Sequence, residues 1–308
     1  HNVLYRIHKD EPNVNEFIPI VKHYEICEQI FLELKANINK VDDYGQFFNN
    51  KVSVVFNAIE RSGISIHREH FKKHFYDESG SKVYTNYNLR TTTTRPSNIY
   101  KRVNYGAISK KDDRRQSFIP SNDVYVELDI SAFHPSLVCN LIDYAFPNMV
   151  DIHSHLAEMY NVDYKKSKEL TFKQLYGGVF KEYKDIEYFK RIDIYVKELW
   201  DEFNSKGHII CPISSYKFEK NELKDMNPQK LFNYLLQNLE TSLNVLILWD
   251  ILKILRGKNT KLVLYVFDSF LLDVDEKELD VVEEIRGVFK KYKLNIKEKK
   301  GTDYELLG

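Results

Sequence analysis

The sequence is poor in cysteine and carries no surplus of charge of either sign. Its 308 residues include three cysteines, Cys27, Cys139 and Cys211, which lie far apart. An odd count without CxxC spacing excludes a disulfide framework and a zinc ribbon, and it favours a reducing, cytoplasmic setting. No apolar run approaches the roughly 18 residues of a membrane span, so we expect no membrane partner.

Basic and acidic residues balance at 45 each, so the whole chain offers no general attraction for nucleic acid. Any basic surface must be local. The strongest candidate is the stretch 90–115, whose charged residues are Arg90, Arg95, Lys101, Arg102, Lys110, Lys111, Asp112, Asp113, Arg114 and Arg115. Such a stretch is usually a solvated face. The chain begins at His1 rather than Met, so we expect a fragment, a processed form or a tag remnant that could lack an upstream domain.

Hydrophobic periodicity predicts an α+β fold with a mostly antiparallel sheet. The spacing of apolar residues predicts helices over residues 16–38, 43–61, 134–144, 150–160, 163–177, 183–205, 228–256 and 277–292. Alternating β-prone runs predict strands at 124–131, 261–266 and 270–274, and a hairpin at 207–217. The polar residues 76–122 are expected to form loops with short strands.

Two aspartates stand at the ends of apolar strands. Asp129 ends the strand in ELDISAFHPSLV, and Asp268 lies at the turn between two strands in LYVFDSFLLDV. A carboxylate at the tip of a buried strand is costly unless it is paired or binds a cation. Two of them on adjacent strands are typical of a site for two Mg²⁺ ions roughly 4 Å apart, which serves phosphoryl transfer. Each aspartate alone is more often a turn or cap residue.

The helix expected over 163–177 carries a cation and two rings on one face. Lys168, Phe172 and Tyr176 are spaced i, i+4 and i+8, and Gly177-Gly178 follow them. This stripe could bind a triphosphate and stack on a base, while the glycines allow a template to approach the backbone. Taken alone, the pattern is more often the core stripe of an amphipathic helix.

Seven segments in order make residues 50–308 similar to the family A DNA polymerases, the bacterial polymerase I type. These segments are NAIERSGISI (57–66), TTTTRPSN (91–98), RRQSFIPSNDVYVELDIS (114–131), DIHSHLAEMYNV (151–162), KELTFKQLYGG (168–178), NYLLQ (233–237) and VFDSFLLDV (266–274). The fifth matches the family's K-x-x-x-F-x-x-x-Y-G motif throughout. The last matches V-H-D-E-x-x-x-x-V at its Asp and both Val positions. Each segment is weak alone, but their order is specific.

The resemblance implies a right-hand polymerase fold, with a palm built on an antiparallel sheet, helical fingers and a reduced or absent thumb. It implies an enzyme that adds deoxynucleoside triphosphates to the primer of a primer-template DNA. Asp129, the Ile130 carbonyl and Asp268 would hold two Mg²⁺ ions, with Mn²⁺ as a substitute, and Lys168 would be the catalytic acid. The residues implied to bind nucleotide are Ile130, His134, His153, Lys165, Phe172 and Tyr176. Those implied to bind primer-template are Arg95, Asn98, Arg114, Arg115, Gly177, Asn233 and Gln237.

The resemblance also divides the chain. Residues 1–62 would be an N-terminal helical region, a remnant of exonuclease-domain helices, and 63–123 a thumb stub with primer-contacting loops. The palm would comprise 124–150 and 206–308, and the fingers 151–205. With so short a thumb, the grip on DNA should be weak and salt-sensitive, so we expect a processivity or replisome partner. Such a compact form would suit a phage or a mobile element.

Four positions depart from the family pattern. Tyr164 stands where the family has Arg, although Lys165 or Lys166 could supply its charge. Phe267 and Ser269 flank the motif's aspartate in place of His and Glu. His134 replaces the Glu that excludes the 2′-hydroxyl of a ribonucleotide.

These departures keep alternatives open. One is a single-subunit RNA polymerase or a primase-like enzyme on the same fold, which His134 allows. Another is a catalytically silent polymerase-like subunit that binds nucleic acid, although the retention of Asp129, Asp268 and Lys168 argues against it. A third is a metal-dependent nuclease built on the two aspartates, which would leave the motif around Lys168 unexplained. The sequence as a whole favours the DNA polymerase.

Overall fold

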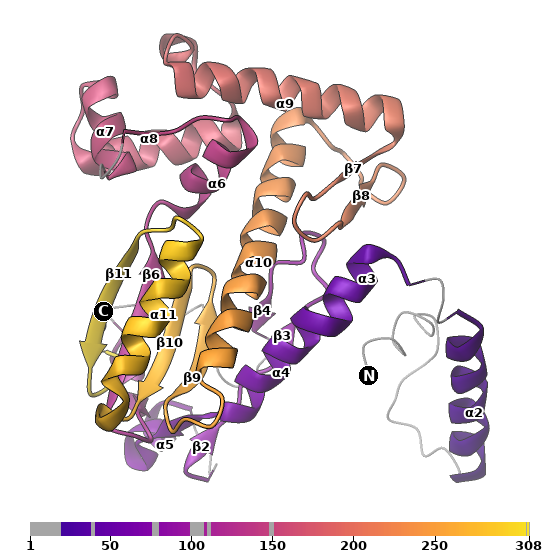
Figure 1. Cartoon of the computed structure of the whole chain (residues 1–308), viewed down its shortest axis with the longest axis vertical. Coiled ribbons are helices and arrows are strands. Elements are labelled where there is room, and N and C mark those ends of the chain that lie inside the picture. The colour runs from indigo at the N-terminus through magenta and orange to yellow at the C-terminus, as the bar shows by residue number, and fades with distance from the viewer. Residues whose placement is uncertain are drawn as a thin grey trace. The chain divides into compact units, whose positions relative to one another are not determined.

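A computed structural model of the protein describes residues 20–37, 41–75, 80–98, 108–109, 112–147, 151–305 and 307 (Figure 1). The chain forms two compact units, His1–Gln46 and Phe47–Gly308. In the first unit, α2 (Ile20–Asn37) confirms the helix expected over 16–38 for its described part. None of the described helices has the length and apolar character needed to cross a membrane.

A four-stranded antiparallel sheet, in the order β11-β6-β10-β9, is the centre of the second unit. Its strands are β6 (Val124–Ile130), β9 (Lys261–Val266), β10 (Ser269–Val274) and β11 (Ile296–Gly301). The first three confirm the predicted strands. The fourth was not predicted, because its sequence IKEKKG lacks the alternation of apolar residues that marks a half-buried strand. It is an edge strand, and its charged side chains are typical of edges.

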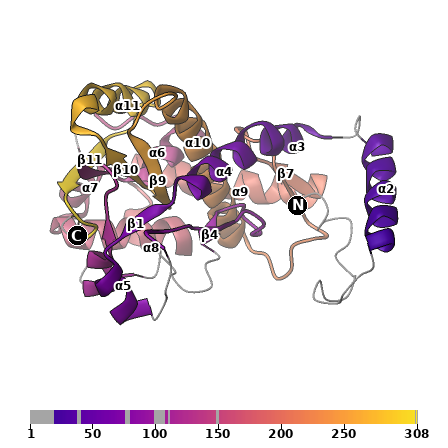
Figure 2. The ribbon, with the colours of Figure 1, turned by 90° about the horizontal axis from the view of Figure 1, so that it is seen from below.

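The two faces of β6 contribute to different cores. Its even-numbered residues, such as Leu128, pack with helices α10 (Pro228–Ile254) and α11 (Leu279–Lys291). On the other face, Tyr125 packs with Phe71, Phe118 and Tyr304. Figure 2 shows α10 and α11 on one side of the sheet and α5 on the other. The alternation of β6 therefore separates a large helical core from a smaller one.

Short elements that the sequence analysis did not resolve surround the smaller core. They are the three-stranded sheet β2-β1-β5, formed by β1 (Ile64–Ile66), β2 (Lys82–Val83) and β5 (Phe118–Ile119), together with helix α5 (Arg68–Phe75) and the 3-10 helix η4 (Asp113–Ser117). A second small pairing joins β3 (Tyr87–Asn88) to β4 (Ser97–Asn98). Strands of two or three residues are too short to show the alternation of apolar and polar residues that predicts a strand.

Most of the remaining helices confirm their predictions. They are α6 (Phe133–Leu141), α7 (Ile152–Tyr160), α8 (Tyr164–Gly177) and α9 (Glu187–Lys206), with the hairpin β7 (His208–Ile210) and β8 (Lys217–Glu219) after them. The helix expected over 43–61 is α3 (Asp43–Phe47), a π-helical turn η2 (Phe48–Val52) and α4 (Ser53–Ser62). In Figure 1, α7, α8 and α9 lie beyond one end of the sheet.

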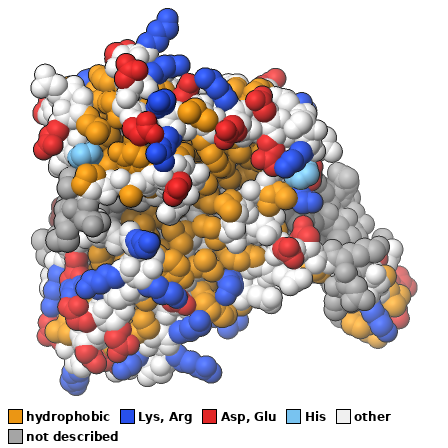
Figure 3. Space-filling view, turned by 45° about the horizontal axis from the view of Figure 1, so that its top comes forward, with side chains coloured by type: hydrophobic (Ala, Val, Ile, Leu, Met, Phe, Trp, Pro, Cys, Tyr) orange, Lys and Arg blue, Asp and Glu red, His pale blue; other side chains and the backbone are white. Residues whose placement is uncertain are grey.

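Helix α10 connects these parts, because it contacts α4, α6, α8, α9 and α11. Its start is well defined: the Asn227 side chain accepts a hydrogen bond from the backbone N–H of Lys230 at 2.8 Å, and Pro228 occupies the first turn. Figure 3 shows one face of the molecule, on which hydrophobic side chains gather in the middle and charged side chains of both signs lie around them.

Candidate active site

A pocket of about 190 Å³ opens between the end of the sheet, α10 and the helices α6, α7 and α8. It brings together His134 and residues from five of the seven segments singled out in the sequence, namely Arg95, Asp129, Ile130, His153, Lys168, Phe172, Tyr176 and Asp268. Ser131, Ala132, Phe133, Tyr164, Glu240 and Lys297 complete the lining. Segments far apart in the sequence therefore converge on one place.

Of the two pocket aspartates, Asp129 lies on β6 and Asp268 lies in the turn before the neighbouring strand β10. Asp129 pairs in register with Ser269, the residue after Asp268, and the Ile130 N–H donates to the Asp268 carbonyl at 2.9 Å. Burial raises the pKa of Asp268 to about 6, and the negative charge of Asp129 acts in the same direction. A cation beside the pair would relieve this cost. Two carboxylates and a backbone carbonyl are oxygen donors that Mg²⁺ prefers, so these residues fit a divalent-cation site.

The turn that presents Asp268 is held from behind by a buried amide. Phe267 has a left-handed backbone with φ of 57°, which is unfavourable for a residue with a side chain. Asn244 of α10 is fully buried, and its Nδ2 donates to the Phe267 carbonyl at 2.9 Å and to the Tyr265 hydroxyl at 2.8 Å. These bonds fix the turn against α10, so the position of Asp268 depends on the helix.

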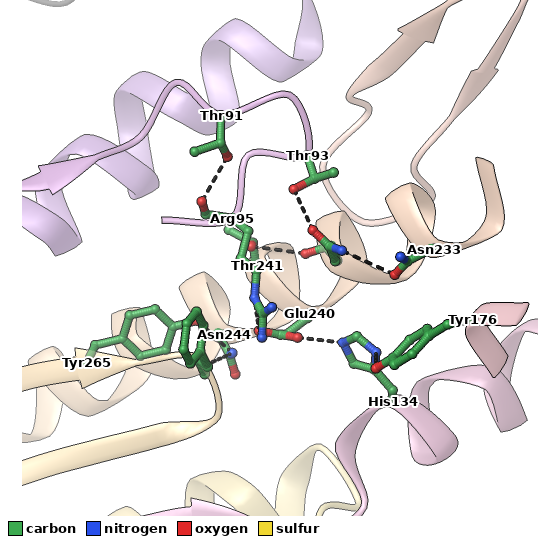
Figure 4. Close-up of polar contacts among 12 residues, drawn as sticks. Thr91, Thr93, Arg95, His134, Tyr176, Asn233, Glu240, Thr241, Asn244 and Tyr265 are labelled. Atoms are coloured by element: carbon green, nitrogen blue, oxygen red, sulfur yellow. Dashed lines mark hydrogen bonds and ion pairs between the residues drawn. The ribbon is translucent and has the colours of Figure 1, made fainter. Parts of the chain in front are cut away.

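A chain of polar contacts crosses the side of the pocket (Figure 4). Glu240, 2 % exposed on α10, accepts from Arg95 Nε at 3.0 Å and contacts His134 Nε2 at 2.5 Å. The other ring nitrogen of His134 lies 2.8 Å from the Tyr176 hydroxyl. The Arg95 guanidinium also covers the ring of Phe267 at 4.1 Å. The loop of Arg95, α10, α6 and α8 are thus coupled through one buried carboxylate.

The opposite side of the pocket carries a histidine and two lysines that suit an anionic ligand. His153 is 2 % exposed, and neither of its ring nitrogens has a hydrogen-bond partner. Burial lowers the pKa of His153, and the positive charges of Lys168 and Lys297 lower it further. Both lysines line the pocket. A buried ring without partners beside two cations is typical of a site whose ligand completes the hydrogen bonds.

Some expected contacts are placed elsewhere. Lys165 is exposed and does not line the pocket, whereas its neighbour Tyr164 does. Arg114 is half-exposed and donates from Nε to Asp112 at 2.9 Å. Arg115, expected on a DNA-binding surface, is 2 % exposed, with its guanidinium 3.7 Å from the ring centre of Tyr304. That expectation is wrong for Arg115 in this arrangement, because the smaller core covers its side chain.

The other candidates for primer-template contact do not line the pocket. Gln237 Nε2 donates to Asn233 Oδ1 at 3.1 Å, and Gln237 Oε1 accepts from Thr93 Oγ1 at 2.9 Å. Gly177 is the last residue of α8, and a side chain added there would meet no atom within 4 Å. Asn98 lies in β4, where it pairs with Tyr87.

Three residues of the site were missed by the sequence analysis, namely Glu240 and Lys297, which line the pocket, and Asn244, which supports the Asp268 turn. The sequence did contain a pattern that points to Glu240 and Asn244. Asn233, Gln237, Glu240 and Asn244 follow one another at spacings of four, three and four in an otherwise leucine-rich helix, which places them on one face. Lys297 had no such signal, because only the pairing of β11 with β6 brings it opposite Asp129.

No protein-family model matches the chain, and no curated protein sequence matches it. Among solved structures, the chain is similar to the POL domain of Pol1 from M. smegmatis in complex with DNA primer-template and dNTP. The TM-score is 0.66 at 15 % sequence identity, and the match covers 78 % of this chain and 50 % of that one. The chain thus spans about half the length of that structure. The likeness shows the fold, which is the α+β fold of a polymerase domain with an antiparallel sheet.

Proposed function

We propose that the protein is a template-directed DNA polymerase that extends a primer with deoxynucleoside triphosphates. The observation that carries the proposal is the convergence of Asp129 and Asp268 with Lys168, His153 and Tyr176 in one pocket. The similarity in fold to a polymerase domain solved with primer-template and dNTP supports it. In this proposal residues 124–150 and 206–308 would form the palm, and residues 151–205 the fingers.

The chemistry would be in-line phosphoryl transfer. Asp129, Asp268 and the Ile130 carbonyl would hold two Mg²⁺ ions, which stabilise charge on the attacking and leaving oxygens. The primer 3′-oxygen would bond to the α-phosphorus as the bond to pyrophosphate breaks. Lys168 would give a proton to the pyrophosphate, and the hydroxyl proton would pass to solvent. Most of the rate enhancement would come from positioning and charge.

The triphosphate would lie along the cationic side of the pocket. Lys168 and His153 would contact its oxygens, as the sequence predicted. Lys297 would supply the second fixed charge, the role expected of Lys165, because Lys297 lines the pocket and Lys165 does not. Phe172 and Tyr176, whose rings stack at 5.8 Å on one face of α8, would flank the base and the sugar.

The sugar would face His134 and Tyr176. Their direct contact would fill the position toward which a 2′-hydroxyl projects, and the buried Glu240 contacts the other side of the His134 ring. Glu240 would be a positioning residue in this scheme, since it reaches the substrate only through His134. Arg95, Asn233 and Gln237 would contact the primer-template end, and the short elements after Gly63 would leave processivity to a partner protein.

Primer extension tests the proposal. The chain is incubated with a labelled primer on a longer template, Mg²⁺, and either four deoxynucleotides or four ribonucleotides. Extension to template length with deoxynucleotides, abolished in Asp268→Asn and unchanged in the distant variant Asp250→Asn, supports it. Extension with ribonucleotides alone would move the assignment to an RNA-synthesising enzyme, the alternative that His134 in place of Glu leaves open. Binding of primer-template without extension would support a silent subunit instead.

A further inference from the structure

A second group of metal-ligating side chains lies outside the pocket, between α5 and the 3-10 helix η4. One ring nitrogen from each of His70 and His74 and one carboxylate oxygen of Asp113 lie within 4.8 Å of one another. His70 and His74 are spaced i, i+4 on α5, so their rings project from one face of the helix. Asp113 begins η4, which packs on α5. The group therefore spans two elements that are adjacent only in the fold.

The two histidines are arranged for ligation rather than for ordinary hydrogen bonding. His70 Nδ1 lies 2.9 Å from Ser117 Oγ, which orients the ring and leaves its Nε2 for another partner. His74 Nε2 is buried and has no hydrogen-bond partner, although the Asp113 carboxylate is 3.5 Å away. The two rings lie 4.5 Å apart. The ring nitrogen and the carboxylate thus face each other at an ion-pair distance without a hydrogen bond, an arrangement that an ion bound by both groups would satisfy.

The electrostatics of the group suit neutral imidazoles. Burial lowers the pKa of His70, and the neighbouring His74 lowers it further, while the negative charge of Asp113 acts in the opposite direction. Neutral imidazole is the ligand form, and a second contact to the other ring nitrogen is the usual support of a metal-bound histidine. Asp113, whose side chain is 60 % exposed, supplies the negative charge and an opening to solvent.

We propose that His70, His74 and Asp113 bind one divalent transition-metal ion of the zinc type, with Ser117 supporting His70 and solvent completing the coordination. Two imidazoles and one carboxylate match Zn²⁺ and its neighbours, whereas Mg²⁺ prefers oxygen ligands alone. The site is independent of the proposed polymerase activity. Its ion would join α5 to η4, directly before β5 and the strand that carries Asp129, and would stabilise the smaller core.

The test uses the full chain carrying Asp129→Asn and Asp268→Asn, so that the pocket aspartates do not bind the added ion. Zn²⁺ is titrated into the metal-free protein by calorimetry, and Co²⁺ binding is followed by its visible absorption. We expect one site, loss of binding in His74→Ala, and affinity about 10–100-fold weaker in Ser117→Ala. His155→Ala, which removes a histidine elsewhere in the same unit, is the control and should bind normally.

The melting temperature provides a second test of the proposed metal site. Zn²⁺ should raise the melting temperature of the parent chain and of His155→Ala, but not of Asp113→Asn. Because Asp113 is exposed, its replacement should not disturb folding, so a lost effect of Zn²⁺ would reflect lost binding. Circular dichroism checks that each variant is folded. The proposal is overturned if the parent chain binds no Zn²⁺ at about 0.1 mM, or if both His74→Ala and Asp113→Asn bind it as the parent does. Neither result bears on primer extension.

Discussion

The carboxylate of Glu240 fixes the tautomer of His134. A carboxylate only accepts, so the His134 nitrogen 2.5 Å from it, Nε2, carries a hydrogen. In the neutral ring Nδ1 then accepts, and the Tyr176 hydroxyl donates to it across 2.8 Å. Burial raises the pKa of Tyr176 to about 12, which keeps that hydroxyl protonated. A residue of α10 thereby determines how two other helices face the pocket.

Replacing Glu240 should therefore alter the choice of sugar before it abolishes synthesis. Glu240→Gln keeps the size of the side chain but removes the charge-assisted bonds to Arg95 and His134. We expect the ratio of kcat/KM for deoxynucleotides to that for ribonucleotides to fall about tenfold, equivalent to ~1.4 kcal/mol. Single-turnover kinetics with matched nucleotides measure the ratio.

The control for this prediction is Glu127→Gln. Glu127 is also buried, but it accepts from Ser269 Oγ at 2.8 Å and does not line the pocket. Its replacement should change stability without changing the ratio. If Glu240→Gln only lowered the melting temperature and left selectivity intact, Glu240 would be structural and not a positioning residue.

Asp268 should lower the stability of the metal-free protein. Its folded pKa of about 6 lies above the ordinary 3.8, so the fold favours the protonated form. The stability associated with that form is complete below pH 3.8 and is lost as the pH rises through about 6. Asp268→Asn should accordingly stabilise the chain by up to ~3 kcal/mol at pH 7.5 and by little near pH 4. Urea unfolding in a chelator at both pH values measures this.

A buried aspartate on β10, the strand that follows Asp268, provides the contrast. Asp273 accepts from the backbone N–H groups of Ser121 at 2.7 Å and Asn122 at 2.9 Å. Asp273→Asn should destabilise the protein by about 1–3 kcal/mol, since it leaves a buried donor poorly matched. Equal destabilisation by both variants at pH 7.5 would contradict the electrostatic account of Asp268.

Binding of Mg²⁺ should depend on pH over the same range. Below about pH 6 the ion must displace the Asp268 proton, so its affinity should fall about tenfold for each further unit of pH. Above this range the affinity should level off. Calorimetric titrations in buffers of different ionisation enthalpy count the proton released. A constant affinity from pH 5 to pH 7 would show that Asp268 does not hold the ion.

Lys297 should contribute to nucleotide binding. Lys297→Met keeps much of the length of the side chain and removes its charge from the pocket. We expect KM for deoxynucleotides to rise about tenfold with a smaller change in kcat, because a fixed charge binds the triphosphate in both the ground and transition states. Lys300→Met on the same strand, whose amine is 3.8 Å from Glu276, is the matched control. If both variants raised KM equally, the effect would come from the loss of positive charge in general and not from a contact of Lys297 with the nucleotide.

Local patterns and long-range pairing differ in what a sequence can reveal. The strands that bear Asp129 and Asp268, and the helix that bears Lys168, are periodic and could be predicted because each buries one face over several residues. The polar stripe of α10 was equally local and could have identified Glu240. By contrast, the edge strand that places Lys297 opposite Asp129 has no apolar pattern.

Arg115 is the clearest error of the sequence analysis. Its place in a basic stretch indicated a surface, but burial depends on Tyr304, which lies near the other end of the chain. No local rule distinguishes a solvated arginine from one that a distant ring covers. The same limit applies to His70, His74 and Asp113, whose proximity follows from the packing of η4 on α5.

The order of the strands has a consequence for synthesis on the ribosome. β6 lies between β10 and β11, and β11 is the last strand of the sheet to be translated. A nascent chain that has reached Val274 carries both aspartates, yet β6 still exposes one row of unpaired backbone groups and the pocket lacks Lys297. The pocket is therefore completed only once β11 has been translated, and a chain released before β11 would be an aggregation hazard with an incomplete pocket.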